Sequence, residues 1–106
     1  MVRLGIGLYG IGAEGLLNCS ALKTVISQIK EVFPGESVGY NRSFYCETNM
    51  RIAIVPIGYA DGLNRALSNG VGHFYINGST AKIIGHNCMD MCMVDTTGID
   101  AIEGDE

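Results

Sequence analysis

The sequence predicts a mainly β fold, a small closed or partly open β-barrel, on three observations. Short runs rich in Val, Ile, Tyr and Phe recur along the chain, as they do in strands. Turns containing glycine separate these runs, and Asn77-Gly78 between two alternating runs is the strongest hairpin signal. The hydrophobic content is 47% over 106 residues, which is enough for one packed domain of modest size.

The first expected element is a strand at the N-terminus. Apolar residues alternate there with arginine and glycine, as Val2, Leu4, Ile6 and Leu8 against Arg3, Gly5 and Gly7. A glycine-containing loop is expected over residues 11–20. Residues 22–33 are ambiguous, because their apolar spacing suits a helix whereas their Thr, Val and Ile content favours a strand. Pro34-Gly35 ends this segment in a turn under either interpretation.

The rest of the chain favours strands and turns. Strands are expected over residues 37–48 and 50–60, which are rich in aromatic and β-branched residues. Residues 60–70 have room for one short helical turn before Asn69-Gly70. Residues 73–85 form the predicted hairpin, and residues 83–95 form the last predicted strand.

The last predicted strand carries four potential metal ligands at every second position, His86, Cys88, Asp90 and Cys92. On a strand they would share one face, with same-face neighbours roughly 6.5 to 7 Å apart. Four ligands in such a row do not converge as a tetrahedral zinc site requires, and the chain has no second pair of C-x-x-C type. A buried strand without a metal is therefore the preferred interpretation, and a metal site is the alternative.

The composition argues against several kinds of partner. The net charge is −4 and the seven Lys and Arg are scattered, so no basic patch is expected to bind nucleic acid. No apolar run reaches the ~18 residues of a membrane helix, and the N-terminus lacks the pattern of a signal peptide. Four cysteines without paired spacing favour a reducing compartment. A cytoplasmic location is expected.

Five segments together resemble the C-terminal portion of alanine racemase, in order and in approximate spacing. They are VRLGIGLYG, PGESVGYNRSFY, RIAIVPIGYADGLNRAL, INGSTAKIIGHNCMDMCMVD and the closing GDE. The resemblance implies a pyridoxal-phosphate enzyme that interconverts L-alanine and D-alanine for peptidoglycan synthesis. It also implies a head-to-tail homodimer in which an N-terminal barrel carries most of the cofactor site.

The same resemblance sets the expected domain organisation. Residues 1–10 would be the end of the last strand of the barrel, and residues 11–106 the C-terminal β-barrel domain, truncated at its end. Residues 22–33 are expected to be a strand. The lysine that holds the cofactor in the family has no counterpart here, because Lys23, Lys30 and Lys82 lie outside the family's motif. The chain is thus expected to be a fragment that is inactive alone.

Two tyrosines match motifs of the family. Tyr40, in ESVGYNRSFY, matches the catalytic tyrosine that removes the α-proton of the L-enantiomer. Racemisation needs acid–base groups on opposite faces of the α-carbon, and a phenol acts as a base at neutral pH only beside positive charge. Tyr59, in PIGYADG, matches the tyrosine that narrows the substrate channel. Without the resemblance, both would be interpreted as packing residues.

Three N-terminal residues match cofactor-binding positions of the family. Arg3 matches the arginine that contacts the pyridine nitrogen of the cofactor. A guanidinium stays protonated, so that nitrogen remains neutral and side reactions are restrained. Gly5 and Ile6 match positions whose backbone N–H groups contact the phosphate, and glycine allows the backbone to approach closely.

The resemblance also gives residues 83–95 a role without a metal. Met89 matches the residue whose backbone N–H binds the substrate carboxylate in the neighbouring subunit's site. Asp90 is expected to orient groups at the substrate entrance, where Arg65 matches an entrance arginine. His86 occupies a position where many relatives carry arginine, so this entrance is expected to be less positive at neutral pH.

Two other functions stay open from the sequence. One is a free-standing β-barrel interaction module without catalysis, and the other is a racemase of another amino acid, such as serine. Whether the parent is a plain racemase or is fused to a cell-wall ligase is open as well.

Overall fold

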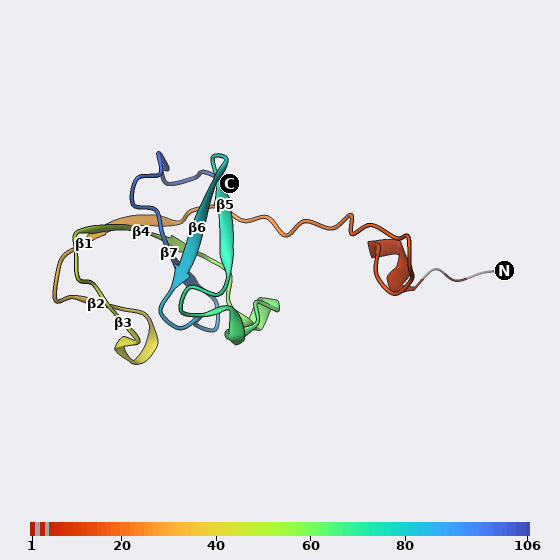
Figure 1. Cartoon of the computed structure of the whole chain (residues 1–106), viewed down its shortest axis with the longest axis horizontal. Helices are drawn as coiled ribbons and strands as arrows, with labels where there is room; N and C mark the ends of the chain where they lie inside the picture. Colours follow the sequence, from red (N-terminus) through yellow and green to blue (C-terminus); the bar gives the residue numbers. More distant parts are fainter. Residues whose placement is uncertain (2, 4) are drawn as a thin grey trace.

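The computed structural model describes residues 1, 3 and 5–106, and the described chain is mainly β (Figure 1). Its strands are β1 (Gln28–Val32), β2 (Ser37–Val38), β3 (Phe44–Tyr45), β4 (Met50–Val55), β5 (His73–Ile76), β6 (Ser79–Ile84) and β7 (Cys92–Asp95). Its helices are 3₁₀ turns, η1 (Ile6–Tyr9), η2 (Tyr40–Arg42), η3 (Tyr59–Asp61) and η4 (Arg65–Leu67). Among these residues no helix has the length and apolar character needed to cross a membrane.

The main sheet has five antiparallel strands in the order β1-β4-β7-β6-β5, and β2 and β3 pair as a separate small sheet. The mainly β prediction is therefore confirmed. Within the described chain β1 and β5 remain at opposite edges of the main sheet, so the sheet is open rather than a closed barrel.

The central strands are buried on both faces. Ala53 and Val55 of β4 belong to one core cluster with Ile83 and Val94, on the face that the segment around Ile26 covers. The other face carries a second cluster, whose buried members are Val32, Val38, Cys46, Ile52, Ile84 and Met93. Strands covered on both sides lose the alternation of apolar and polar residues, which explains the continuous apolar run over residues 52–55 of β4.

The predicted hairpin is confirmed. β5 and β6 pair from His73↔Lys82 to Ile76↔Ser79, with Asn77-Gly78 between them. Asn77 has φ 49° and Gly78 has φ 78°, and positive φ at both central residues is what a type I′ turn requires.

The ambiguous segment 22–33 contains a strand, as expected, but a shorter one. β1 starts at Gln28 and pairs with β4 from Gln28↔Ile54 to Val32↔Met50. The helical alternative is wrong, because Ile26 and Val32 are buried whereas Leu22 and Phe33 on the same proposed stripe are exposed. The ladder with β4 supplies backbone partners that outweigh the helical spacing.

The expected strand over residues 83–95 is wrong in its middle. β6 ends at Ile84 and β7 begins at Cys92, so residues 85–91 form a connecting loop, hereafter the 85–91 loop. Gly85 has φ 66°, and a Cβ there would lie 2.9 Å from the Val38 carbonyl oxygen. Glycine suits this turn for two reasons: it adopts a positive φ without strain, and it leaves room for the backbone of the neighbouring segment.

Three other expected elements differ in detail. The strand over residues 37–48 is interrupted by η2, where Asn41 and Arg42 both have positive φ. The strand over residues 50–60 ends at Val55, before Pro56, which has no N–H to continue a ladder. Residues 60–70 contain η4 and the end of η3 rather than one helical turn.

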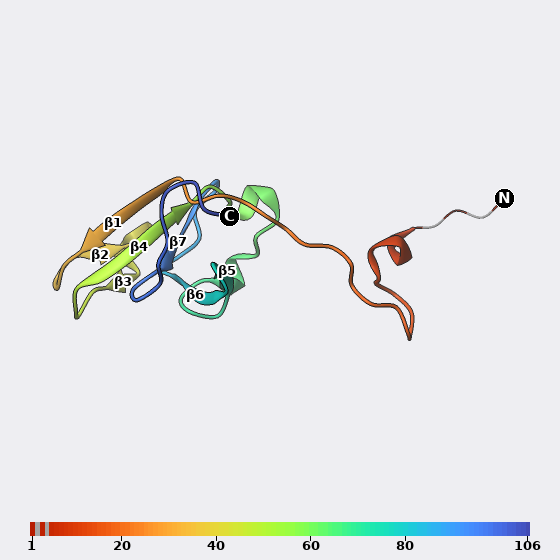
Figure 2. The same cartoon turned by 90° about the horizontal axis from the view of Figure 1, so that it is seen from above.

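The expected N-terminal strand is also wrong over its described part. Ile6–Tyr9 form η1, a 3₁₀ turn, and Val2 and Leu4 lie outside the described residues. A strand needs a partner, and no described segment pairs with this one. Residues 5–20 extend away from the sheets, which gives the chain principal extents of 60 × 28 × 22 Å (Figures 1 and 2).

Candidate active site

The 85–91 loop is the centre of the candidate site, because the turns η2, η3 and η4 all pack against it. It joins β6 to β7 and is drawn in light blue in Figure 1. These turns carry Tyr40, Tyr59 and Arg65, and the loop itself carries His86, Met89 and Asp90. Six residues that the sequence singled out are therefore grouped around one loop.

The residue before η2, Gly39, contacts the start of this loop. Gly39 has φ 84°, and a Cβ there would lie 3.0 Å from both Gly85 Cα and His86 N. The backbone N–H of His86 donates to Ser43 Oγ at 2.8 Å. Tyr40 directly follows Gly39 and is 70% exposed. The close backbone contact thus fixes the main-chain position of Tyr40, while its ring extends into solvent.

η3 contacts the middle of the loop through main-chain atoms. The N–H of Tyr59 donates to the Cys88 carbonyl at 3.1 Å, and the N–H of Ala60 donates to the Met89 carbonyl at 2.9 Å. A Cβ on Gly58 would lie only 2.3 Å from the Met89 oxygen. Glycine at 58 is therefore required for space, and the contact brings the Tyr59 main chain beside that of Met89.

The Met89 backbone N–H remains available for a ligand. It donates to no acceptor in the described part of the chain, although the neighbouring Cys88 N–H donates to the Met91 carbonyl at 2.9 Å. The Met89 side chain is 59% exposed. A free main-chain donor at an exposed loop is suited to bind a carboxylate oxygen.

η4 contacts the loop at Asn87, which is 1% exposed. The Asn87 N–H donates to Ser68 Oγ at 3.0 Å, and its side-chain amide donates to the Asn64 carbonyl at 3.2 Å. Asn87 Oδ1 is buried and accepts no hydrogen bond within the described residues. The loop is therefore held to η4 by two hydrogen bonds and keeps one buried acceptor without a partner.

The three residues that were expected at the substrate entrance, Arg65, His86 and Asp90, are all polar or charged. The Arg65 guanidinium carbon lies 5.5 Å from the centroid of the Tyr59 ring, within the range of a cation–π contact. His86 is half-buried, and its Nδ1 lies 3.4 Å from Asn69 Nδ2. Asp90 is exposed. The positive charge of Arg65 is thus held over the tyrosine that was expected to narrow the channel.

The three expected cofactor residues do not join this group. Arg3, Gly5 and Ile6 belong to the N-terminal segment, which extends away from the sheets (Figure 2). Conversely, four residues of the site have no signal in the sequence pattern: Ser43, Gly58, Ser68 and Asn87. Their roles depend on contacts between distant segments, so only the folded chain reveals them.

The four alternating ligand types do not form a metal site in this structure. No group of three His, Cys, Asp and Glu side chains in residues 1, 3 and 5–106 is placed to hold a metal ion. Cys92 is wholly buried, and burial, helped by the nearby Cys88, raises the pKa of its thiol to about 12. The argument from one strand face is wrong, since His86, Cys88 and Asp90 lie in the loop.

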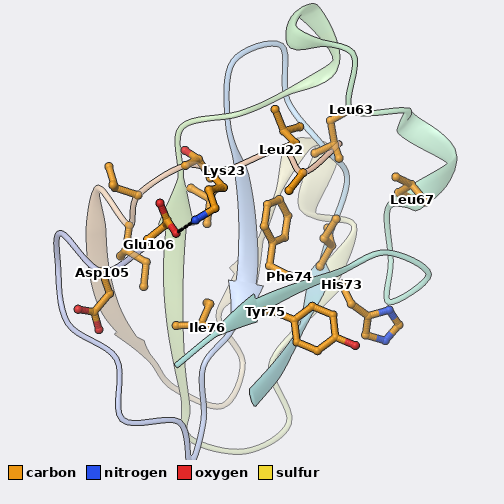
Figure 3. A pocket seen from close by; sticks show the side chains of 16 residues that line it. Leu22, Lys23, Leu63, Leu67, His73, Phe74, Tyr75, Ile76, Asp105 and Glu106 are labelled. Atoms are coloured by element: carbon orange, nitrogen blue, oxygen red, sulfur yellow. Dashed lines mark hydrogen bonds and ion pairs between the residues drawn. The ribbon is translucent and has the colours of Figure 1, made fainter. Parts of the chain in front are cut away.

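A cavity lies elsewhere in the described chain. A cavity of about 460 Å³ separates the β5–β6 hairpin from residues 21–26 (Figure 3). Its lining is mainly apolar, with Leu22, Leu63 and Phe74 prominent, and the ion pair of Lys23 with Glu106 lies at its edge. None of the site residues predicted from the sequence lines it. The candidate site is therefore defined by the turns around the 85–91 loop and not by this cavity.

Residues 19–106 match the family model described as alanine racemase, C-terminal domain. The chain belongs to this family. Alanine racemase 1 of Clostridium acetobutylicum is 49% identical to it, over 98% of this chain and 29% of the relative. The crystal structure of the biosynthetic alanine racemase from Pseudomonas aeruginosa superposes with a TM-score of 0.82 at 34% identity, covering 95% of this chain and 30% of that one.

The comparison also bears on the cofactor of the family. The alanine racemase from Bartonella henselae, solved with covalently bound pyridoxal phosphate, matches with a TM-score of 0.77 at 37% identity. It is covered over 30% of its chain, while 95% of the present chain is matched. Alanine racemases are pyridoxal-phosphate enzymes, and the chain spans just under a third of the length of the relatives it matches.

Proposed function

We propose that this alanine racemase domain is the C-terminal part of an enzyme that interconverts L-alanine and D-alanine. Residues 1–10, which have no strand partner within the described chain, would become the end of the last barrel strand only when paired with an N-terminal barrel, and residues 11–106 would form the β domain. The enzyme would act as a head-to-tail homodimer in the cytoplasm, supplying D-alanine for peptidoglycan. The observation that carries the proposal is that Tyr40 and Tyr59 lie on turns packed against the 85–91 loop, which itself contains Met89.

Tyr40 is the proposed acid–base group on one face of the substrate. Its exposed ring allows the hydroxyl to reach a substrate bound outside this chain. Removing a proton from one face of the α-carbon and returning one to the other requires two groups. Tyr40 takes the proton of the L-enantiomer, and a lysine from the barrel serves the opposite face.

The carboxylate of the substrate is the proposed ligand of the Met89 N–H. That N–H is free of acceptors in the described chain and lies in an exposed loop. The Arg65 guanidinium carbon lies 5.5 Å from the centroid of the Tyr59 ring. Tyr59 would narrow the substrate channel, and Arg65 would give it a positive charge. His86 and Asp90 would complete the entrance. The substrate carboxylate would pass this entrance on its way into the partner subunit's active site.

The N-terminal residues fit a pyridoxal-phosphate site in part. When bound, the cofactor withdraws electrons from the α-carbon and so makes its proton acidic. A Cβ on Gly5 would meet nothing within 4 Å, so the space beside Gly5 is open for a phosphate to approach. Arg3 is exposed and would donate to the ring nitrogen while staying protonated. The lysine that anchors the cofactor would come from outside this chain.

The test is a Tyr40→Phe substitution in the complete enzyme. Where needed, this chain replaces the matching part of the Clostridium acetobutylicum racemase, which is 49% identical. Removing a general base lowers turnover by roughly 10² to 10⁴, so L-to-D conversion should fall by that much. Exchange of the D-alanine α-proton with deuterated water should persist, because it depends on the lysine face.

Tyr45→Phe is the matched control, since Tyr45 is also exposed and lies five positions further along the chain. The 106-residue chain alone is the negative arm, with no turnover expected. Survival of both exchange reactions at equal rates in the Tyr40→Phe enzyme would show that Tyr40 is not the base.

A further inference from the structure

Two serines from different turns hold consecutive backbone amides of the 85–91 loop. Ser43, at the end of η2, accepts the N–H of His86 at 2.8 Å. Ser68, at the end of η4, accepts the N–H of Asn87 at 3.0 Å. Ser68 is 5% exposed and Ser43 is half-buried, so water competes little for either hydrogen bond.

The two hydrogen bonds link the segments that carry the candidate site residues. Ser43 lies in the segment that begins with Gly39 and Tyr40, and Ser68 follows the turn that contains Arg65. The next amide, that of Cys88, donates to the Met91 carbonyl at 2.9 Å. Three successive amides are therefore occupied by partners, and the fourth, that of Met89, points to none in the described chain.

We propose that Ser43 and Ser68 are positioning residues that fix the 85–91 loop, and with it the carboxylate-binding N–H of Met89, relative to Tyr40 and Arg65. This inference rests on the proposed function for its catalytic consequence. The loop has no strand ladder of its own over residues 85–91. The main-chain hydrogen bonds from η3 hold its middle at Cys88 and Met89, whereas the N–H groups of His86 and Asn87 depend on the two serine acceptors. Removing one acceptor from a buried N–H leaves that group unsatisfied.

The predicted effect falls on substrate binding rather than on the proton-transfer step. A net hydrogen bond contributes about 0.5 to 1.5 kcal/mol, which corresponds to roughly two- to tenfold in an equilibrium constant. In the complete enzyme, Ser43→Ala and Ser68→Ala should each raise KM for L-alanine by about two- to tenfold. The kcat should change by less than about threefold, because neither serine touches the reacting atoms.

The experiment measures kcat and KM in both directions, together with inhibition by propionate as a probe for the carboxylate site. Ser43→Thr keeps a hydroxyl at the half-buried position and should restore KM. Ser79→Ala is the matched control, because Ser79 is exposed beside the tip of the β5–β6 hairpin. Hydrogen exchange of the His86 and Asn87 amides in the same proteins reports the loop independently of activity.

A rise in KM and in the propionate inhibition constant, with faster exchange of these amides and rescue by Ser43→Thr, supports the inference. Unchanged KM and exchange in both alanine variants overturn it, as does a fall in kcat at constant KM. If Tyr40→Phe leaves turnover intact, the proposed function fails. The exchange rates then still decide whether the serines hold the loop.

Discussion

Asn87 is almost wholly buried, yet only one of the two polar atoms of its side chain has a hydrogen-bond partner among the described residues. Its side-chain nitrogen donates to the Asn64 carbonyl, whereas Oδ1 has no donor among the described residues. Turning the amide over would place an oxygen against the Asn64 carbonyl oxygen. The hydrogen bond to the Asn64 carbonyl therefore sets the orientation of the amide, and Oδ1 is left as a buried acceptor without a donor among the described residues.

The substitution Asn87→Asp tests this arrangement through its pH dependence. An ionised carboxylate buried against the Asn64 carbonyl should destabilise the fold by about 2 to 4 kcal/mol at pH 7. Burial should raise the pKa of the new carboxyl above that of the unfolded chain, so the folded state binds the proton more tightly. Stability should then recover as the pH falls, because the protonated group can donate to Asn64.

Denaturant unfolding between pH 4 and pH 7 measures the effect, with Asn49→Asp at an exposed position as the control. A loss of stability that is the same at all pH values would contradict the role assigned to the Asn64 carbonyl.

At the scale of elements, the contact between η3 and the 85–91 loop depends on a missing side chain. Gly58 has φ −142°, which any residue can adopt, so its requirement is one of space rather than of backbone conformation. The atoms that a Cβ would meet are the carbonyl groups of Cys88 and Met89. Backbone of this kind cannot rotate away as a flexible side chain would.

Gly58→Ala should therefore displace the 85–91 loop. The expected loss of stability is about 1 to 3 kcal/mol, as for other overpacked sites. Tyr59 and Ala60 should lose their hydrogen bonds to this loop, and the amide exchange of both should speed up. Gly5→Ala is the control, because a Cβ there meets nothing within 4 Å. A Gly58→Ala protein with unchanged stability and exchange would disprove the contact.

The elements differ in how far their sequence predicted them. The β5–β6 hairpin was predictable because Asn77 and Gly78 encode the turn within two residues. The 85–91 loop was not, because the alternation of polar and apolar residues continues through Met89 and Met91. The strand that this alternation predicts is interrupted by contacts of residues 85 and 86 with Gly39 and Ser43, which are distant in sequence.

The same distinction holds for the candidate site. Tyr40, Tyr59 and Met89 were accessible through their motifs, because a motif is a local string. Ser43 and Ser68 were not, because their hydrogen-bond partners are distant in sequence. The bond of Ser43 spans 43 positions and that of Ser68 spans 19 positions. A hydroxyl that accepts a distant amide leaves no period or spacing in the sequence.

Across the whole molecule, the last residues of the chain join the hairpin to the start of β1. The backbone carbonyl of Asp105 accepts from Ile26 N–H at 2.8 Å. Its carboxylate accepts from the N–H of Ile102 at 3.0 Å and from Asn77 Nδ2 at 2.7 Å. The Ile102 N–H, and then the Asn77 amide, lower the pKa of the Asp105 carboxyl. One residue thus connects three segments that are far apart in sequence.

The stability that Asp105 contributes should depend on pH in a defined direction. Its folded pKa is lowered, so the contribution is present above the unfolded pKa and is lost as the pH falls through the folded value. The midpoint of thermal unfolding should therefore drop between pH 6 and pH 3. In Asp105→Asn this drop should be smaller. Asp100→Asn, at an exposed position, is the control, and an equal drop in all three proteins would contradict the assignment.

The contact between η3 and the 85–91 loop has a consequence for sequence variation. Its hydrogen bonds run from the N–H groups of Tyr59 and Ala60 to the carbonyls of Cys88 and Met89, so no side chain takes part. Substitutions at these four positions can therefore alter the size and polarity of the approach to the site without moving its framework. Replacements of Gly58, Ser43 or Ser68 would instead disturb this framework, because those contacts depend on the residue itself.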